Sequence, residues 1–132
     1  MRKVSFLKGA FTPLVVPFKG DEIDYDGYAR LIEWQIGQGT HGLLVNATSG
    51  EPTTLTLDEK VRLIEVAVKT SANRKPVAAG IPAESHSEAV WLLTRAEKAG
   101  VDALVSVTPY YVRPPQRGLQ TSSKFGTMSA VT

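Results

Sequence analysis

Short apolar runs alternate with amphipathic helical segments along this chain, and the apolar runs recur at roughly the 30-residue length of one right-handed strand–helix unit. Four strands are expected, at Gly9–Phe18, Gly42–Asn46, Pro76–Gly80 and Ala103–Val107. An uninterrupted apolar run such as Gly42–Asn46 is typical of a strand that is covered on both faces of a parallel sheet. The pattern therefore predicts an α/β protein.

Three helices are expected between these strands, and each begins with a capping signal. Asp24 is a good N-cap for a helix that ends near Gln38, Thr56 and Glu59 form a capping box, and Ser85 opens the third helix. The apolar spacing predicts that one side of each helix faces the core: Tyr28, Leu31, Ile32, Gln35 and Ile36; Leu57, Val61, Ile64 and Val68; Ala89, Leu92, Leu93 and Ala96.

An internal similarity supports a repeated unit. Gly39–Val45 and Gly100–Ser106 both contain a helix-ending glycine, a short turn and a buried strand. Two architectures contain such units: a doubly wound sheet of the flavodoxin type, which could bind a small anion, and the first four βα units of a (β/α)8 barrel, which needs about 250 residues.

The end of the chain bears on that choice. Residues 120–132 show no apolar helical stripe and no capping signal, so no fourth covering helix is predicted there. The fourth strand would then lie at a sheet edge without a helix of its own, so the sequence looks interrupted.

Composition excludes several classes of function. The chain has no cysteine, which excludes a disulfide scaffold, a thiolate metal site and a cysteine nucleophile. A net charge of +2 is too small to suggest nucleic acid as a partner, and no apolar run is long enough for a membrane span or a signal peptide. We therefore expect a cytoplasmic protein. Dinucleotide and phosphate-loop fingerprints and acidic clusters are missing, so neither a cofactor nor a metal is predicted.

Polar residues follow two of the strands, at the sheet edge where ligands of parallel α/β proteins bind. After the second strand, Thr48, Ser49 and Gly50 could direct hydroxyl and amide donors at a carboxylate or phosphate, or they could form a plain turn. After the fourth strand, the phenol of Tyr110 or Tyr111 could relay a proton or pack at a subunit contact. His41 and His86 are expected to be surface residues.

Three motifs, in this order, resemble the dihydrodipicolinate synthase / N-acetylneuraminate lyase family of class I pyruvate-dependent aldolases. They are Gly9-Ala10-Phe11-Thr12-Pro13-Leu14, Thr48-Ser49-Gly50-Glu51-Pro52 and Val107-Thr108-Pro109-Tyr110-Tyr111. The likeness runs from about Gly9 to Leu119. It implies a (β/α)8 barrel, of which residues 1–119 would form the amino-terminal half, truncated before a divergent, disordered tail at residues 120–132. It also implies Schiff-base chemistry on pyruvate or another 2-oxo acid, catalysed as a lyase or synthase.

The resemblance also implies roles for individual residues. Thr48 would bind the substrate carboxylate and join a proton relay, and Ser49 would be the second carboxylate donor, within the loop that contains Gly50. Tyr111 would be the relay tyrosine, reaching the site of a neighbouring subunit in a homo-oligomer. Such a relay would move protons while the imine forms and is released.

The chain departs from the family in ways that limit its expected activity. The family's Schiff-base lysine lies on the sixth strand, beyond the end of this sequence, so the chain alone is expected to be inactive unless half-barrels work as an oligomer. The lysines at 60, 69, 75 and 98 fall on predicted helix faces or turns and are expected to be solvated.

Other departures concern regulation and substrate. Ala47 replaces a usual glycine, Gly80–Glu84 replaces a loop that accompanies lysine feedback, and Leu57 and Lys60 replace two histidines of that regulatory pocket. No lysine feedback is therefore expected, and a sugar acid or related 2-oxo acid is as plausible a substrate as that of the lysine-pathway enzyme.

Overall fold

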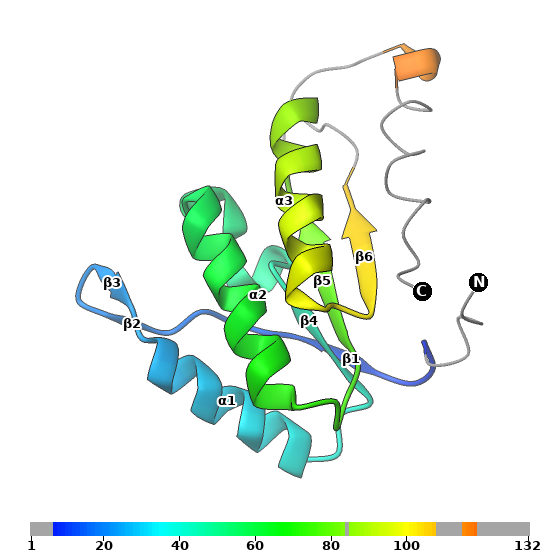
Figure 1. Cartoon of the computed structure of the whole chain (residues 1–132). Coiled ribbons are helices and arrows are strands. Elements are labelled where there is room, and N and C mark those ends of the chain that lie inside the picture. Colours follow the sequence, from blue (N-terminus) through cyan, green and yellow to red (C-terminus); the bar gives the residue numbers. More distant parts are fainter. Residues whose placement is uncertain (1–6, 84, 108–114, 119–132) are drawn as a thin grey trace.

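The computed structural model describes residues 7–83, 85–107 and 115–118 (Figure 1). Its elements alternate along the chain between strands and helices, as the sequence predicts. In chain order they are β1 (Phe11–Pro13), β2 (Phe18–Lys19), β3 (Glu22–Ile23), α1 (Tyr25–Gly37), β4 (Gly42–Val45), the 3-10 turns η2 (Thr48–Gly50) and η3 (Pro52–Thr54), α2 (Leu57–Ser71), β5 (Val77–Ile81), α3 (His86–Ala99) and β6 (Ala103–Ser106).

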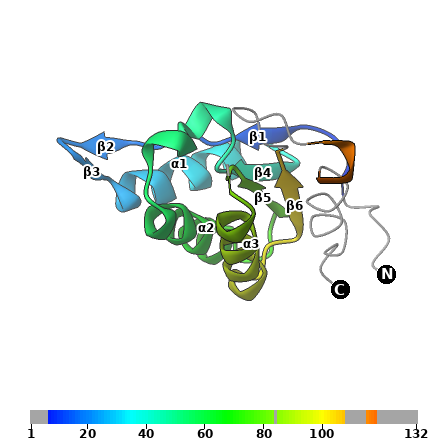
Figure 2. The same cartoon turned by 90° about the horizontal axis from the view of Figure 1, so that it is seen from above.

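Four strands form one parallel sheet whose spatial order, β1-β4-β5-β6, follows the chain order. Such an order has no switch point, whereas a flavodoxin-like sheet reverses direction after its first strands. Helix α1 contacts α2 and α2 contacts α3, and Figure 2 shows all three on the same side of the sheet. The described residues are therefore successive units of a (β/α)8 barrel, and the flavodoxin-like alternative is wrong.

The first strand is much shorter than predicted, and a small hairpin was missed. The prediction extended the strand over Gly9–Phe18, but β1 ends at Pro13 and β2 pairs with β3 in a separate antiparallel hairpin. The Leu14 N–H still donates to the Leu44 carbonyl at 3.0 Å, and the predicted segment beyond that bond contains Pro17, which has no N–H to donate to a ladder. Figure 1 shows the hairpin projecting away from the parallel sheet.

Helix α1 begins where the sequence predicts. The Asp24 carboxylate accepts a hydrogen bond from the backbone N–H of Gly27 at 2.9 Å. This bond is the main reason why the pKa of Asp24 lies below its usual range, and the nearby ammonium of Lys19 and guanidinium of Arg30 lower it further. Among the predicted core positions of α1, two are buried (Tyr28 and Ile32) and three are half-buried (Leu31, Gln35 and Ile36).

The capping box of α2 is confirmed, and Val61, Ile64 and Val68 lie in or against the core as predicted, but the predicted core-facing set is incomplete. The Thr56 N–H donates to the Glu59 carboxylate at 2.8 Å, and the Glu59 N–H donates to the Thr56 hydroxyl at 3.3 Å. The buried residues are Lys60, Leu63, Ile64, Ala67 and Ser71, whereas Leu57, Val61 and Val68 are half-buried. Because α2 packs between α1 and α3, its apolar residues also cover the two helix–helix contacts.

The repeated unit is confirmed by two matching helix ends. Gly39 and Gly100 both adopt left-handed backbone, at φ +87° and +89°. The residue after each glycine donates its N–H back to the preceding helix, Thr40 to Gln35 at 3.3 Å and Val101 to Ala96 at 3.4 Å. In α3, Leu92 and Ala96 are buried as predicted, while Ala89 and Leu93 are half-buried.

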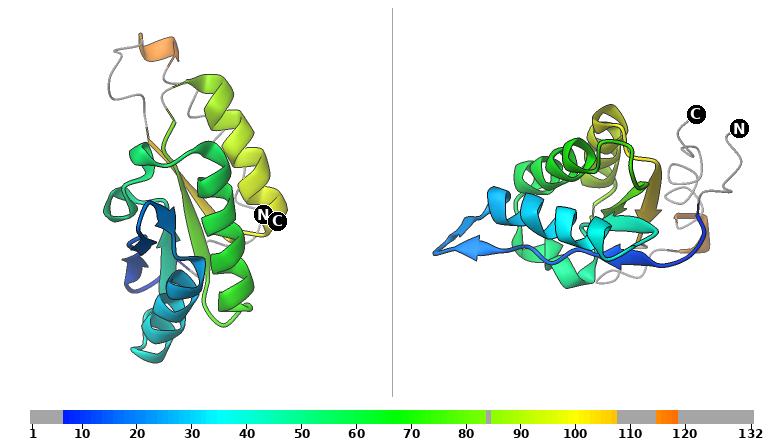
Figure 3. Two further views of the ribbon diagram at one scale, coloured as in Figure 1. Left: turned by 90° about the vertical axis from the view of Figure 1, so that its left-hand side faces the viewer. Right: turned by 90° about the horizontal axis from the view of Figure 1, so that it is seen from below.

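The hydrophobic core lies between the sheet and the helices. Leu43 and Val45 of β4 and Ala79 of β5 are fully buried there, together with Leu63, Ile64 and Leu92 from the helices. Figure 3 shows the helical layer against one face of the sheet. No helix within the described ranges is both long and apolar enough to span a lipid bilayer.

Candidate functional site

The sheet has one face against the helices and one open face. Because side chains alternate along a strand, Leu43 and Val45 point into the core while Leu44 is half-exposed on the other face. On β6, Leu104 packs against the core and Val105 is 46% exposed. The open face of the sheet is therefore apolar.

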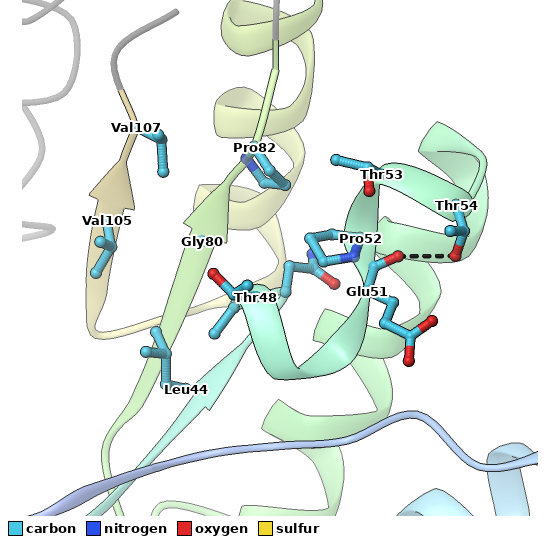
Figure 4. A pocket seen from close by; sticks show the side chains of 12 residues that line it. Leu44, Thr48, Glu51, Pro52, Thr53, Thr54, Gly80, Pro82, Val105 and Val107 are labelled. Atoms are coloured by element: carbon cyan, nitrogen blue, oxygen red, sulfur yellow. Dashed lines mark hydrogen bonds between the residues drawn. The ribbon is translucent and has the colours of Figure 1, made fainter. Parts of the chain in front are cut away.

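A cavity of about 700 Å³ lies on this open face, at the carboxyl ends of β4, β5 and β6 (Figure 4). Ligands of parallel α/β proteins collect at these strand ends. The residues that line the cavity come from the strands and from the loop after β4: Leu44, Asn46, Ala47, Thr48, Glu51, Pro52, Thr53, Thr54, Gly80, Pro82, Val105 and Val107.

The loop after β4 consists of two 3-10 turns joined at Glu51, which is left-handed at φ +48°. The N–H of Gly50 donates to the carbonyl of Ala47 at 2.9 Å, and the N–H of Glu51 donates to the carbonyl of Thr48 at 3.0 Å. The Thr54 hydroxyl closes the second turn by donating to the Glu51 carbonyl at 2.8 Å. The loop is therefore an ordered platform rather than a plain extended connection.

The three predicted site residues of this loop have different environments in the structure. Thr48 is exposed and lines the cavity, and Figure 4 shows its side chain directed toward β5 near Gly80. Ser49 is also exposed but is not among the lining residues. Gly50 is buried under the loop. Of the two neighbouring hydroxyl residues, Thr48 therefore belongs to the cavity lining and Ser49 does not.

Gly50 is required for close packing rather than for a left-handed turn. A Cβ atom at this position would lie 3.0 Å from the backbone oxygen of Leu14, so the loop rests directly on the chain just after β1. The left-handed residues at this end of the sheet are Asn46, at φ +55°, and Glu51. Gly50 therefore serves the packing of the loop, and the turns in the backbone direction occur at Asn46 and Glu51.

Asn46 is a site residue that sequence reasoning did not single out. Its side chain is 5% exposed, and its Nδ2 donates to the backbone oxygen of Lys60 at 3.2 Å. Its left-handed backbone at the end of β4 directs the chain into the loop. The only signal in the sequence is that asparagine tolerates such backbone better than most residues.

Lys60 is buried, contrary to the prediction that all four of these lysines are solvated. Its side chain is 7% exposed between the helices, whereas Lys69 and Lys98 are exposed and Lys75 is half-buried. Burial lowers the pKa of the Lys60 ammonium, and the Glu88 carboxylate of α3 partly opposes that shift. Lys60 does not line the cavity, and neither does any other lysine within the described residues.

The remaining predicted residues lie elsewhere. Tyr111, like Tyr110, is outside the described residues, as are residues 120–132. The exposed His41 accepts a hydrogen bond from the N–H of Ala10 at 3.1 Å, at the amino-terminal end of the strands, and His86 is exposed in the first turn of α3. In the part of the chain that the structure describes, no three His, Cys, Asp or Glu side chains are grouped to hold a metal ion.

Comparison with known proteins agrees with this architecture. The sequence model of the Dihydrodipicolinate synthetase family matches residues 6–126. The 4-hydroxy-tetrahydrodipicolinate synthase of Bartonella henselae is 51% identical over 116 residues, which are 87% of this chain and 40% of that protein. The chain thus spans about two-fifths of the length of such curated relatives.

Solved structures also superimpose closely on this chain. The chloride-inhibited dihydrodipicolinate synthase of Acinetobacter baumannii, complexed with pyruvate, superimposes with a TM-score of 0.87 at 34% identity, over 92% of this chain and 42% of that one. CdNal of Clostridium difficile, complexed with mannosamine, gives a TM-score of 0.87 at 27% identity, over 92% of this chain and 43% of that one. The chain therefore belongs to the dihydrodipicolinate synthetase family.

Proposed function

We propose that this chain supplies the carboxylate-docking part of a pyruvate or 2-oxo-acid site, as in Schiff-base-forming lyases and synthases. The observation that carries the proposal is the cavity at the carboxyl ends of β4–β6, with Thr48 in its lining and Ser49 beside it. The complex of the Acinetobacter baumannii relative with pyruvate supports this substrate class.

The docking chemistry follows from the loop. Thr48 offers a hydroxyl donor in the cavity lining, and the adjacent Ser49 would supply a second donor. A carboxylate accepts such donors more strongly than a neutral oxygen does. The apolar walls formed by Leu44, Val105 and Val107 suit the methyl end of pyruvate. Holding the carboxylate at the loop would orient the keto carbon toward the open face of the sheet.

We further propose that the amine that attacks the keto carbon is not among the described residues of this chain. To form a Schiff base, a deprotonated lysine amine must attack the keto carbon, and the resulting carbinolamine must lose water to give the imine. Lys60 has the desolvated amine and lowered pKa that such a step needs, but it lies outside the cavity lining, in the helical layer. On this proposal the 132-residue chain docks the substrate without turning it over.

Tyr111 as a proton relay, and its contact with a neighbouring subunit in a homo-oligomer, remain predictions from the family resemblance. The family's relay would pass protons between the Thr48 hydroxyl and a tyrosine phenol.

Titration of the ¹⁵N-labelled chain with pyruvate tests the docking proposal. Saturable shifts of the Thr48 and Ser49 amide signals are expected. Methyl pyruvate, which keeps the keto group but lacks the carboxylate, is the matched control and should leave these signals in place. Equal shifts with both compounds, or no shift with either, would overturn the proposal.

A further inference from the structure

The loop that carries Thr48 leaves the sheet at Asn46, whose backbone conformation and buried side chain are both constrained. Asn46 has left-handed backbone at φ +55°, and its side chain is 5% exposed. Its Nδ2 donates across the core to the backbone oxygen of Lys60 in α2, at 3.2 Å. The start of the loop is therefore tied to a helix that contributes no residue to the cavity lining.

The neighbouring strand fixes Asn46 from the other direction. Gly80 of β5 lies so close that a Cβ atom there would stand 2.5 Å from the Asn46 backbone oxygen. The Asn46 carbonyl therefore cannot move further toward β5. The hydrogen bond from the Asn46 side-chain amide to the Lys60 carbonyl holds the side chain toward α2. The backbone of Asn46 is thus held on two sides.

We propose that Asn46 is a positioning residue for the carboxylate-docking loop, an inference that rests on the proposed function of Thr48. Thr48 is two residues beyond Asn46, so any rotation of the Asn46 backbone would move the Thr48 hydroxyl relative to the cavity. Donors that are already in place lose less entropy when an anion binds. The tie to α2 thereby sets the geometry of the docking site.

Only one end of the Asn46 side-chain amide has a hydrogen-bond partner among the described residues, and this decides which measurement can test the role of Asn46. Its Oδ1 is buried and accepts no hydrogen bond from the described residues. Removing the whole amide deletes one good bond but also one unsatisfied acceptor, and these effects on the free energy of unfolding oppose each other. Global stability is therefore a poor measure of the role of Asn46, and a local measurement is needed.

The substitution Asn46→Gly isolates the tie to α2, because glycine adopts left-handed backbone without strain but has no side chain to anchor. The chain offers a matched control in Asn73. That residue is also left-handed, at φ +60°, but it is exposed just beyond α2. Asn73→Gly makes the same change of residue at the same backbone conformation, away from the loop.

Amide hydrogen exchange of the 132-residue chain reads out the loop directly. In Asn46→Gly, the Gly50 and Glu51 amides, which close the first 3-10 turn, should exchange on the order of tenfold faster, the effect of losing about one hydrogen bond. The amides of β5 should keep their rates, and Asn73→Gly should leave Gly50 and Glu51 unchanged. Unchanged loop rates in Asn46→Gly, or an equal acceleration in β5, would overturn the inference.

Pyruvate titration of the same variants separates this inference from the proposed function. Asn46→Gly should weaken the pyruvate response of the Thr48 amide several-fold, while Asn73→Gly keeps it. If the unsubstituted chain does not respond to pyruvate, the proposed function fails, and the exchange rates of Gly50 and Glu51 still decide whether Asn46 positions the loop.

Discussion

Gly80 lies directly beneath the backbone carbonyl of Asn46, with only 2.5 Å between that oxygen and the place where a Cβ atom would stand. Strands β4 and β5 pair in parallel through Leu43–Val45 and Val77–Ala79, and Asn46 turns over β5 just beyond this pairing. Only a glycine on β5 allows the chain to leave β4 at this angle. The cavity thus depends on a strand residue that offers no functional group.

Replacing Gly80 by alanine should therefore be costly. The backbone oxygen of Asn46 would have to shift to admit the new methyl group, at a cost of about 1–3 kcal/mol in the free energy of unfolding. Urea denaturation measures this. Gly37→Ala is the control, since nothing lies within 4 Å of the added methyl group at the end of α1. An alanine at 80 that is tolerated as well as one at 37 would show that the Asn46 carbonyl is mobile.

The capping box of α2 predicts a second loss of stability. Thr56→Ala removes the hydroxyl that accepts from the Glu59 N–H, and the free energy of unfolding should fall by about 1 kcal/mol. Thr53→Ala, an exposed threonine in the preceding turn, should change it by less than half as much. Thermal or urea unfolding compares the two variants, and equal effects would argue against the cap.

The buried ammonium of Lys60 predicts a pH dependence whose sign can be stated. Because burial lowers the pKa of Lys60 in the folded chain, the unfolded chain binds more protons between that lowered pKa and the ordinary value of 10.5. The free energy of unfolding therefore gains a contribution that rises with pH across this window. Lys60→Met abolishes it, so the stability of the variant relative to the unsubstituted chain should fall as pH approaches 10.5.

Unfolding curves collected at several alkaline pH values measure this difference. Taking the difference between two chains cancels the other groups that titrate there, including Tyr28, whose pKa burial raises above its usual range. Lys69→Met, on the exposed side of the same helix, serves as control. A flat difference for Lys60→Met, or an equally steep one for Lys69→Met, would mean that Lys60 is not desolvated.

The Thr48 hydroxyl should matter for binding and not for stability. Thr48→Val keeps the shape of the side chain and removes its donor, so the pyruvate affinity should fall about tenfold, the effect of losing one hydrogen bond to a charged group. The exposed position predicts little change in the melting temperature. Thr94→Val on α3 removes a hydroxyl far from the cavity lining, and pyruvate titration should not distinguish it from the unsubstituted chain.

The parallel strands and the helix starts could be predicted from the sequence because their signals are local. Apolar runs mark β4, β5 and β6, and Asp24, Thr56 and Ser85 cap the helices that follow the turns. The β2–β3 hairpin was missed because two-residue strands carry no periodic pattern. The periodic pattern alone fits both a barrel and a doubly wound sheet, because it does not contain the spatial strand order. The motif resemblance favoured the barrel, and the observed strand order confirms it.

The candidate site was predicted only where its residue types are distinctive. The adjacent hydroxyls singled out Thr48, which lines the cavity, together with Ser49, which does not. Asn46, Gly80 and Lys60 were missed because their roles depend on contacts between segments distant in the sequence. A lysine in an amphipathic helix usually extends into solvent, and only the packing of α2 between its neighbours buries Lys60.

The central proposal is that this chain docks a 2-oxo acid and that no amine among its described residues is placed to attack the keto carbon. The most direct measurement is the ¹³C NMR spectrum of pyruvate labelled at its keto carbon, recorded with the 132-residue chain. We predict that the ketone signal broadens as the chain is added and that no imine signal forms. A protein-bound imine, or a ketone signal that the chain leaves unchanged, would contradict the account.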